Sequence, residues 1–589
     1  MIRRALAIAA CLGCAVFLGW SQNAPDDDPL MRAMRDELDR SRQLRVVGGG
    51  DDVPYFISYQ ITDAEGYQVS ASMGAVVSQG RNRYRVPDIQ VRVGNYDFDH
   101  TGHIYSGIYT GSRFDGTWPL DDNYPNLRDA LWLATDRAYK AALESMARKR
   151  AALNSANAPT EKLADFSQVE PVKNIAKVSR KKIDENAWTA RTVKLSSIFN
   201  SYPEVLSSAV NFQAIEGVTY VMNNEGTALR YPDDVATLHG SVEGQAPDGM
   251  ILHDFVGFQQ NGMELLPSEA EMAKGLTAIG QEVQALVKAP LGEGFSGPTL
   301  FEPRAAAQLL AQLIGENVVI ARKPLAEPGR AVNFQPSEFE SKLGSRVLPE
   351  YFNITDDPTQ TSWNGQPLAG HDRFDLEGVP DKAVSLVEKG TLKGFLTTRQ
   401  PVKGSAGSNG HARLSGAYGA RGAAISNLLV SVSESTPLAD LKKKLIDTAK
   451  ERGKSYGMLV RKLDYPYSGG QVGLRGLRSG AGGLARPVSP PLLVYRVYPD
   501  GREELVRGLR FRGVSTRALR DILGASKETA LFDFVNNAFP MAMVGAPGYM
   551  APTSVVAPAL LFDEIEFERP QEQLPKPPVV PPPTGGQQE

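Results

Sequence analysis

The most constraining feature of the sequence is a short helical segment in its second half, from Gly297 to Leu310. Pro303 suits the first turn of a helix, where a backbone N–H would have no partner, and Gly315 suits the exit. Apolar residues recur at helical spacing along this stretch: Ala306, Leu309, Leu310, Leu313 and Ile314. The pattern predicts a helix whose apolar face is buried inside a domain.

The rest of the second half predicts a β-rich domain. Strands are expected at 347–354, 383–388, 394–398, 424–432, 492–497, 504–512 and 559–567, and a charged helix at 438–450. Glycines between these alternating runs mark turns.

The first half mixes helices and strands. Helices are expected at 26–45, 126–154, 183–206 and 268–287, with Ser268 as an N-cap, and strands at 53–61, 67–77, 84–93 and between 209 and 253. At 589 residues the chain is long enough for two or three domains. We divide it into a leader (1–21), an N-terminal α/β region (26–125), a middle helical and mixed region (126–290), a β-rich C-terminal domain (296–568) and a proline-rich disordered tail (569–589).

The leader resembles a secretory signal peptide. Arg3 and Arg4 precede an apolar run of about 16 residues, which is short for a membrane-spanning helix. The alternatives are an uncleaved N-terminal anchor and a lipid-modified Cys14. All three predict that the body of the protein lies in an extracytoplasmic space, periplasmic or secreted, and touches a membrane only through this segment. Because both cysteines, Cys11 and Cys14, fall here, no disulfide framework is expected.

The overall composition is that of an ordinary globular protein. Apolar residues make up 42% of the chain and charged residues 22%, and the net charge is -3. This balance gives no basic surface of the kind that nucleic-acid binding requires, so we expect no nucleic-acid partner.

Four further segments carry glycines, prolines and charges in a characteristic order. They are 346–358, 371–380 with the pattern Phe/Asp-x-Glu-Gly-x-Pro, 386–396 with the pattern Glu-x-Gly-x-Leu-x-Gly, and the Gly/Asn-rich stretch 408–413. Together with the helix, they resemble the TldD/PmbA (TldE) family, whose catalytic members are metallopeptidases. The resemblance implies an α+β fold in which the N-terminal α/β region packs on the β-rich C-terminal domain, with a peptide cleft between them.

The zinc ligands of the catalytic members are missing from this sequence. In those members the helix carries His-Glu-x-x-x-His and a late cysteine completes the site. Here Phe301 and Ala306 take the places of the two histidines, Glu302 matches the glutamate, and the late cysteine would fall near Ala546. Zinc needs three or four converging donors, so the resemblance predicts that the metal site has been lost and that no cofactor is bound. Pro303 also matches the non-catalytic PmbA/TldE type.

The six histidines offer one other candidate metal site. His100 and His103 lie near Asp97 and Asp99, a spacing that could chelate a metal on a loop. The alternative, a polar turn around Gly102, is the interpretation we favour, because Asp, Gly and His are ordinary turn residues.

The resemblance therefore implies a non-catalytic subunit, a pseudoenzyme, of an exported TldD/TldE-like protease acting on small or unfolded peptides. Its partner would be a TldD-like catalytic paralogue or a second copy of itself. Asn409, His411 and Arg413 are candidate peptide-cleft residues, and Arg413 could hold a peptide carboxylate as a fork or be an ordinary surface charge. Two alternatives stay open: a stand-alone peptide-binding or assembly module, and a working hydrolase with relocated ligands at His100 and His103.

Overall fold

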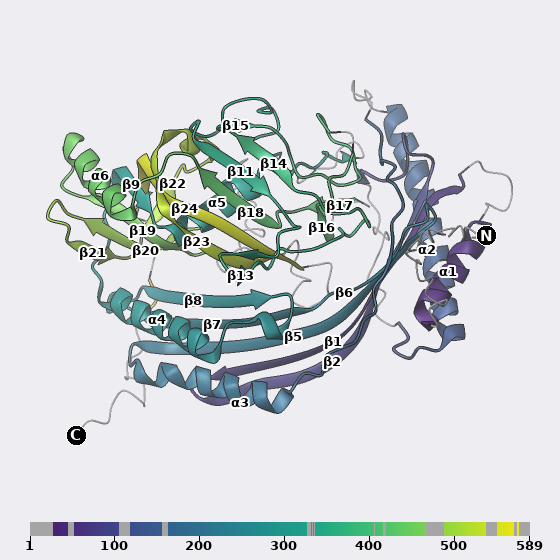
Figure 1. The fold of residues 1–589 in the computed structure, drawn as a ribbon, viewed down its shortest axis with the longest axis horizontal. Helices are drawn as coiled ribbons and strands as arrows, with labels where there is room; N and C mark the ends of the chain where they lie inside the picture. Colours follow the sequence, from purple (N-terminus) through teal and green to yellow (C-terminus); the bar gives the residue numbers. More distant parts are fainter. Residues whose placement is uncertain are drawn as a thin grey trace, which may run out of the picture.

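The computed structural model of the chain describes residues 28–44, 52–104, 118–155, 163–326, 336–405, 407–415, 420–466, 488–537 and 550–569, with 332, 334 and 574–576. It has the predicted α+β fold, with one large sheet in each half of the chain and three small two-stranded sheets besides (Figure 1). The predicted signal peptide and nearly all of the proline-rich tail lie outside the described residues. Within the described ranges, no helix is long and apolar enough to cross a membrane.

The N-terminal sheet has seven strands and is built around β5. Its strands are β1 (Pro54–Ser72), β2 (Ala75–Val93), β4 (Lys173–Ile175), β5 (Val205–Asn223), β6 (Ala228–Pro232), β7 (Val235–Gln245) and β8 (Ile251–Gln260). One edge of β5 pairs with β1. Its other edge pairs with β7 over the first half of its length and with β6 over the second half.

The predicted break within the first strand region is wrong. Instead of three strands, β1 and β2 are two strands of 19 residues each. They are joined by Met73 and Gly74, both at positive φ, as a two-residue hairpin turn requires. The polar stretch that looked like a break, near Glu65 and Gly66, is held in the ladder because β1 is paired on both sides.

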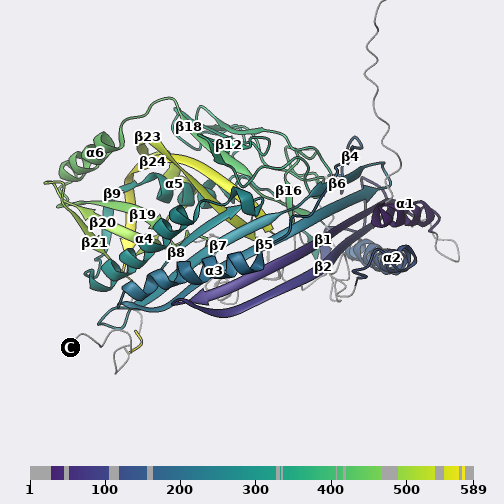
Figure 2. The ribbon, with the colours of Figure 1, turned by 60° about the horizontal axis from the view of Figure 1, so that its bottom comes forward.

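Two helix pairs cover opposite ends of the same face of this sheet (Figures 1 and 2). At one end are α1 (Pro29–Ser41) and α2 (Tyr124–Ser155), and at the other are α3 (Glu185–Ser196), the 3-10 turn η1 (Ser197–Ser201) and α4 (Glu269–Lys288). Ser268 caps α4, as predicted, in a reciprocal capping box with Glu271. The other face is turned to the C-terminal domain: Gln60 in β1, for example, accepts a hydrogen bond from Arg421 at 2.8 Å.

The C-terminal sheet has eleven strands, and its central strand is β24 (Met550–Glu568). β24 pairs with four strands: β9 (Phe295–Phe301), β18 (Asn427–Val432), β22 (Arg510–Arg512) and β23 (Ile522–Asn537). The outer strands are β11 (Phe352–Asp356), β14 (Val384–Glu388), β15 (Thr391–Leu392), β19 (Gly457–Leu463), β20 (Pro491–Val497) and β21 (Glu503–Val506). Helix α5 (Pro303–Leu310) packs on this sheet, and α6 (Leu438–Glu451) borders it.

Four predictions for this half need correction. The single strand expected at 504–512 is two strands, β21 and β22, which pair with different neighbours and are separated by residues 507–509. The stretch 297–301 is not helical but the end of β9, and the helix begins at Pro303. The strand expected at 347–354 begins only at Phe352, because Pro349 cannot donate to a ladder. No strand forms at 394–398, where the Leu396 N–H donates to Val318 and the Thr397 N–H to the Asn409 side chain.

Buried ion pairs join the two halves. Arg399 donates to both carboxylate oxygens of Glu225, at 2.7 and 2.8 Å. Lys462 in β19 pairs with Asp254 in β8 at 2.5 Å, and both are almost fully buried. Because each pair is desolvated, the two halves have one preferred relative position, and any cleft between them has walls of defined shape.

Candidate functional site

The positions expected to carry the metal ligands, at the end of β9 and in α5, offer no ligand set in this structure. Phe301 is fully buried, and its ring lies 5.3 Å from Phe562 and 5.9 Å from Phe511. Ala306 is also fully buried, inside the main hydrophobic core. Neither side chain carries a donor atom for a metal.

Glu302, the one matching carboxylate, is bound by two cations. It is the N-cap residue of α5, but its side chain caps nothing. Its Oε1 lies 3.1 Å from Lys442 Nζ and 3.3 Å from Arg461 Nε, and both cations also bind Glu503. These residues do not fit a zinc ion. Ala546 lies outside the described residues, and among the described ones no group of three or more His, Cys, Asp or Glu side chains is placed to hold a metal.

The second candidate metal site is a buried structural cluster. Gly102 has φ +70°, as a turn requires, and His103 lies in the short strand β3 (His103–Ile104), beside β10 (Leu325–Ala326). Asp99 is engaged by Arg92 at 2.7 Å and by the Thr101 hydroxyl. Burial lowers the pKa of His100 to about 4, which keeps its imidazole neutral.

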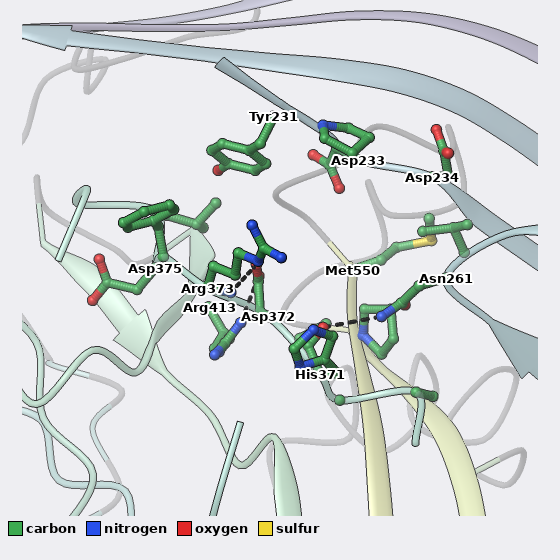
Figure 3. A pocket seen from close by; sticks show the side chains of 18 of the residues that line it. Tyr231, Asp233, Asp234, Asn261, His371, Asp372, Arg373, Asp375, Arg413 and Met550 are labelled. Carbon is green, nitrogen blue, oxygen red and sulfur yellow. Dashed lines mark hydrogen bonds and ion pairs between the residues drawn. The ribbon is translucent and has the colours of Figure 1, made fainter. Parts of the chain in front are cut away.

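A cleft of about 500 Å³ lies between the two halves of the molecule, and we call it the charged cleft. Figure 3 shows its two walls. One wall belongs to the N-terminal half and includes residues 174, 176, 177, 181, 231–235 and 261. The other belongs to the C-terminal domain and includes 369–376, 412–413 and 550–552.

The N-terminal wall carries two adjacent carboxylates. Asp233 accepts a hydrogen bond from the Thr219 hydroxyl at 2.7 Å, and Asp234 accepts one from the Gly217 N–H at 3.0 Å. Burial raises the pKa of Asp233 to about 6, with further contributions from Asp372 and Asp234. Tyr231 lies beside them, and burial raises the pKa of its hydroxyl far above the usual value. Sequence reasoning missed these three residues, because an Asp-Asp pair after a proline resembles an ordinary turn.

The C-terminal wall is organised by Arg413. This predicted cleft residue lines the charged cleft, but its guanidinium is held by Asp372 at 2.7 Å and Asp381 at 2.5 Å. These two ion pairs occupy the guanidinium N–H groups that would otherwise bind a peptide carboxylate. Arg373, the next cation along this wall, is exposed and has no ion pair among the described residues.

The other two predicted cleft residues lie behind this wall. His411 is fully buried, with Nε2 3.0 Å from the Asp356 carboxylate. The Asn409 side chain accepts from the Thr397 N–H and donates to the Phe395 carbonyl. Their role at a peptide cleft therefore stays a prediction, and in this structure they brace the segment just before the short strand β16 (Ala412–Ser415), which carries Arg413.

A second cleft, of about 440 Å³, lies between β8 and β23 and includes Arg304 at the start of α5. Asp533 also lines it, and burial raises the pKa of this carboxyl to about 7. Its Oδ1 accepts from the Ser554 hydroxyl at 2.6 Å. Within the described residues, β8 pairs in register only with β7, and β23 only with β24, so each has a free edge.

Comparison with known proteins connects this architecture to one family. Residues 296–464 match the family described as the PmbA/TldA metallopeptidase C-terminal domain. The C-terminal domain is that of the TldD/PmbA family. No curated protein matches the chain.

Solved structures share the fold of this TldD/PmbA protein along most of its length. TldE from Thermococcus kodakarensis is 14% identical, with a TM-score of 0.55 over 91% of this chain and 100% of that one. A proposed modulator of a DNA gyrase from Thermotoga maritima is 13% identical, with a TM-score of 0.53 over 87% and 96% of the two chains. A second such protein, from Bacteroides thetaiotaomicron, is 10% identical, with a TM-score of 0.51 over 91% and 98%. At these identities, the likeness establishes the fold alone.

Proposed function

We propose that this TldD/PmbA protein is a zinc-free, non-catalytic subunit of an exported TldD/TldE-like metalloprotease acting on small or unfolded peptides. The observation that carries the proposal is the filling of the metal-ligand positions. Phe301 and Ala306 are packed into the hydrophobic core, and Glu302 is neutralised by Lys442 and Arg461. Rebuilding a zinc site there would require new side chains and a repacked core.

Peptide binding is supported by the two clefts between the halves. The free edges of β8 and β23 border the second cleft, and a free strand edge offers N–H and C=O groups to any extended peptide, whatever its sequence. The charged cleft, with polar groups on both walls, adds side-chain recognition. Unfolded chains suit such a site because their backbone groups are not already paired.

The partner in this proposal is a catalytic, TldD-like paralogue, and the compartment is extracytoplasmic. A stand-alone peptide-binding or assembly module remains the alternative, and it would bind peptides equally well without any partner. The hydrolase with ligands relocated to His100 and His103 has little support, since Asp99 is already committed to Arg92.

The test combines metal content, activity and partnership. After dialysis against trace zinc, the purified full chain should retain less than about a tenth of a zinc per molecule and should not cleave an unfolded peptide. It should bind that peptide, measured by fluorescence polarisation, and should enhance cleavage by a co-expressed TldD-like paralogue. Stoichiometric zinc with hydrolysis by the chain alone would refute the proposal, and peptide binding without any effect on the paralogue would favour the stand-alone module.

A further inference from the structure

The second cleft, between β8 and β23, has one cationic side chain among the described residues that line it, and this is Arg304. We infer that the cleft binds a carboxylate of the peptide against Arg304, at the start of α5. The inference rests on the proposed peptide-binding function and adds a substrate class to it: peptides that bring a carboxylate into the cleft, from a free C-terminus or from an acidic side chain.

The surroundings of Arg304 carry the first step. It is the second residue of α5 and is partly buried, and among the residues that the structure describes its guanidinium has no hydrogen bond or ion pair. It acts at longer range on Glu282, which lies 3.4 Å from Lys462 Nζ instead. The side chain of the N-cap residue Glu302 caps none of the first-turn N–H groups, and the start of a helix favours a negative charge. A carboxylate would therefore meet five N–H donors and a favourable helix end.

The acids of the cleft itself are engaged elsewhere. Glu271 accepts from the Ser268 N–H and hydroxyl, at 2.9 and 2.7 Å, in the capping box of α4. Asp533 accepts from the Ser554 hydroxyl at 2.6 Å, and because burial raises its pKa to about 7, it is mostly neutral at pH 6. Neither acid forms an ion pair with Arg304 within the described ranges. The positive charge of Arg304 is therefore left for a ligand.

Two buried glutamines give independent evidence for a polar ligand. Gln259 is 3% exposed and Gln260 5% exposed, and both line the cleft. Within the part of the chain that the structure describes, Gln259 Nε2 has no acceptor and Gln260 Oε1 has no donor. Buried amide groups are normally paired, because an unpaired one costs free energy. The end of a peptide supplies both missing partners: its carboxylate accepts, and its last backbone N–H donates.

The shape and polarity of the cleft suit an extended peptide. Residues 255–260 all line it, so the cleft follows the edge of β8, and residues 531–534 of β23 lie opposite. Phe258, Phe532 and Phe534 give it apolar surface, and the last two rings are stacked with their centres 5.4 Å apart. In such surroundings an arginine–carboxylate pair is stronger than in water.

The experiment measures fluorescence polarisation of N-terminally labelled hexapeptides against the full chain at pH 6. The reference peptide has a central glutamine and a C-terminal amide. A second peptide differs only in its free C-terminal carboxylate, and a third only in a central glutamate. We expect one or both carboxylate peptides to bind about tenfold or more tightly than the reference, because a hydrogen bond to a charged group contributes about that factor. The peptide that gains identifies the source of the carboxylate.

Variants locate the effect at Arg304. Arg304→Gln should remove the preference for a carboxylate and bind the reference peptide as the wild type does, whereas Arg304→Lys keeps the charge and should retain part of the preference. Arg346→Gln, at an exposed arginine that pairs with Glu350 and does not line the cleft, is the matched control and should retain all of it. A thermal unfolding curve for each variant establishes that it is folded.

The outcomes separate this inference from the function beneath it. Equal binding of all three peptides, or an undiminished carboxylate preference in Arg304→Gln, would overturn the inference and leave the proposed peptide binding intact. Failure of every peptide to bind would overturn both.

Discussion

The pair of Arg399 and Glu225 should hold the two halves of the molecule together, and its removal is the sharpest test of that idea. The Arg399 side chain, from the C-terminal half, is fully buried and forms a bidentate pair with Glu225 at 2.7 and 2.8 Å. It also donates twice to the Ser167 carbonyl, at 2.7 and 2.9 Å, and lies 4.0 Å from the centre of the Phe166 ring.

Arg399→Met keeps most of the side-chain volume but removes all of these donors. The variant leaves the Glu225 carboxylate largely buried and without its cation, and it leaves the Ser167 carbonyl without two of its donors. Breaking a buried pair in this way costs about 3–5 kcal/mol, a large part of the stability of an ordinary domain.

The assay is urea unfolding followed by intrinsic fluorescence. We expect Arg399→Met to lower the midpoint and to split the transition, because the halves would no longer unfold together. Arg346→Met is the control: it removes an exposed ion pair with Glu350 in the same half and should leave the midpoint unchanged. The double variant Arg399→Met/Glu225→Met should recover much of the loss, since no charge is then left buried. A loss below about 1 kcal/mol in Arg399→Met would refute this account of the interface.

Three further predictions follow from single sites. Burial raises the pKa of Asp533 to about 7, so the folded protein keeps a proton that the unfolded chain releases at lower pH, and stability falls as pH rises from about 4 to 7. Asp533→Asn should therefore stabilise the protein by up to about 4 kcal/mol at pH 8 but not at pH 4, and equal thermal shifts at both pH values would contradict this. Ser268→Ala removes the α4 capping box and should cost about 1 kcal/mol in urea unfolding, whereas an unchanged midpoint would show that the cap contributes nothing. Phe301→His restores one histidine but should lose about 3 kcal/mol and gain no zinc in a metal assay, because the core has no place for a ligand set; stoichiometric zinc would overturn that reasoning.

Much of the fold was predictable because local signals agreed with the packing. The α4 capping box, the Pro303 start of α5 and the turn at Lys389 and Gly390, both at positive φ, are read directly from residue types. β23 was missed because its stretch around Lys527 resembles a turn, and in the structure this stretch is a register shift within a long strand.

The site was less predictable than the fold. Asp233 and Arg373 lie on opposite walls of the charged cleft because two segments far apart in the chain come together in the fold. No local sequence pattern predicts that these two segments will be neighbours. Arg413 was predicted as a cleft residue from the Gly/Asn-rich segment 408–413. Its ion pairs with Asp372 and Asp381 depend on tertiary contacts, which residue spacing in the sequence does not predict. The replacement of the two histidines by Phe301 and Ala306 was readable from the sequence because the His-Glu-x-x-x-His pattern is local.

The central place of β24 also sets the order in which the protein can fold. β9 ends at Phe301, and the strand that lies against it begins about 250 residues later, at Met550. During synthesis the C-terminal half must therefore wait for almost the whole chain before its sheet can close, and such distant pairings form slowly. Until then, the edges of β9, β18 and β23 that β24 will cover stay unpaired, and such edges are the ones through which incompletely folded chains pair with one another.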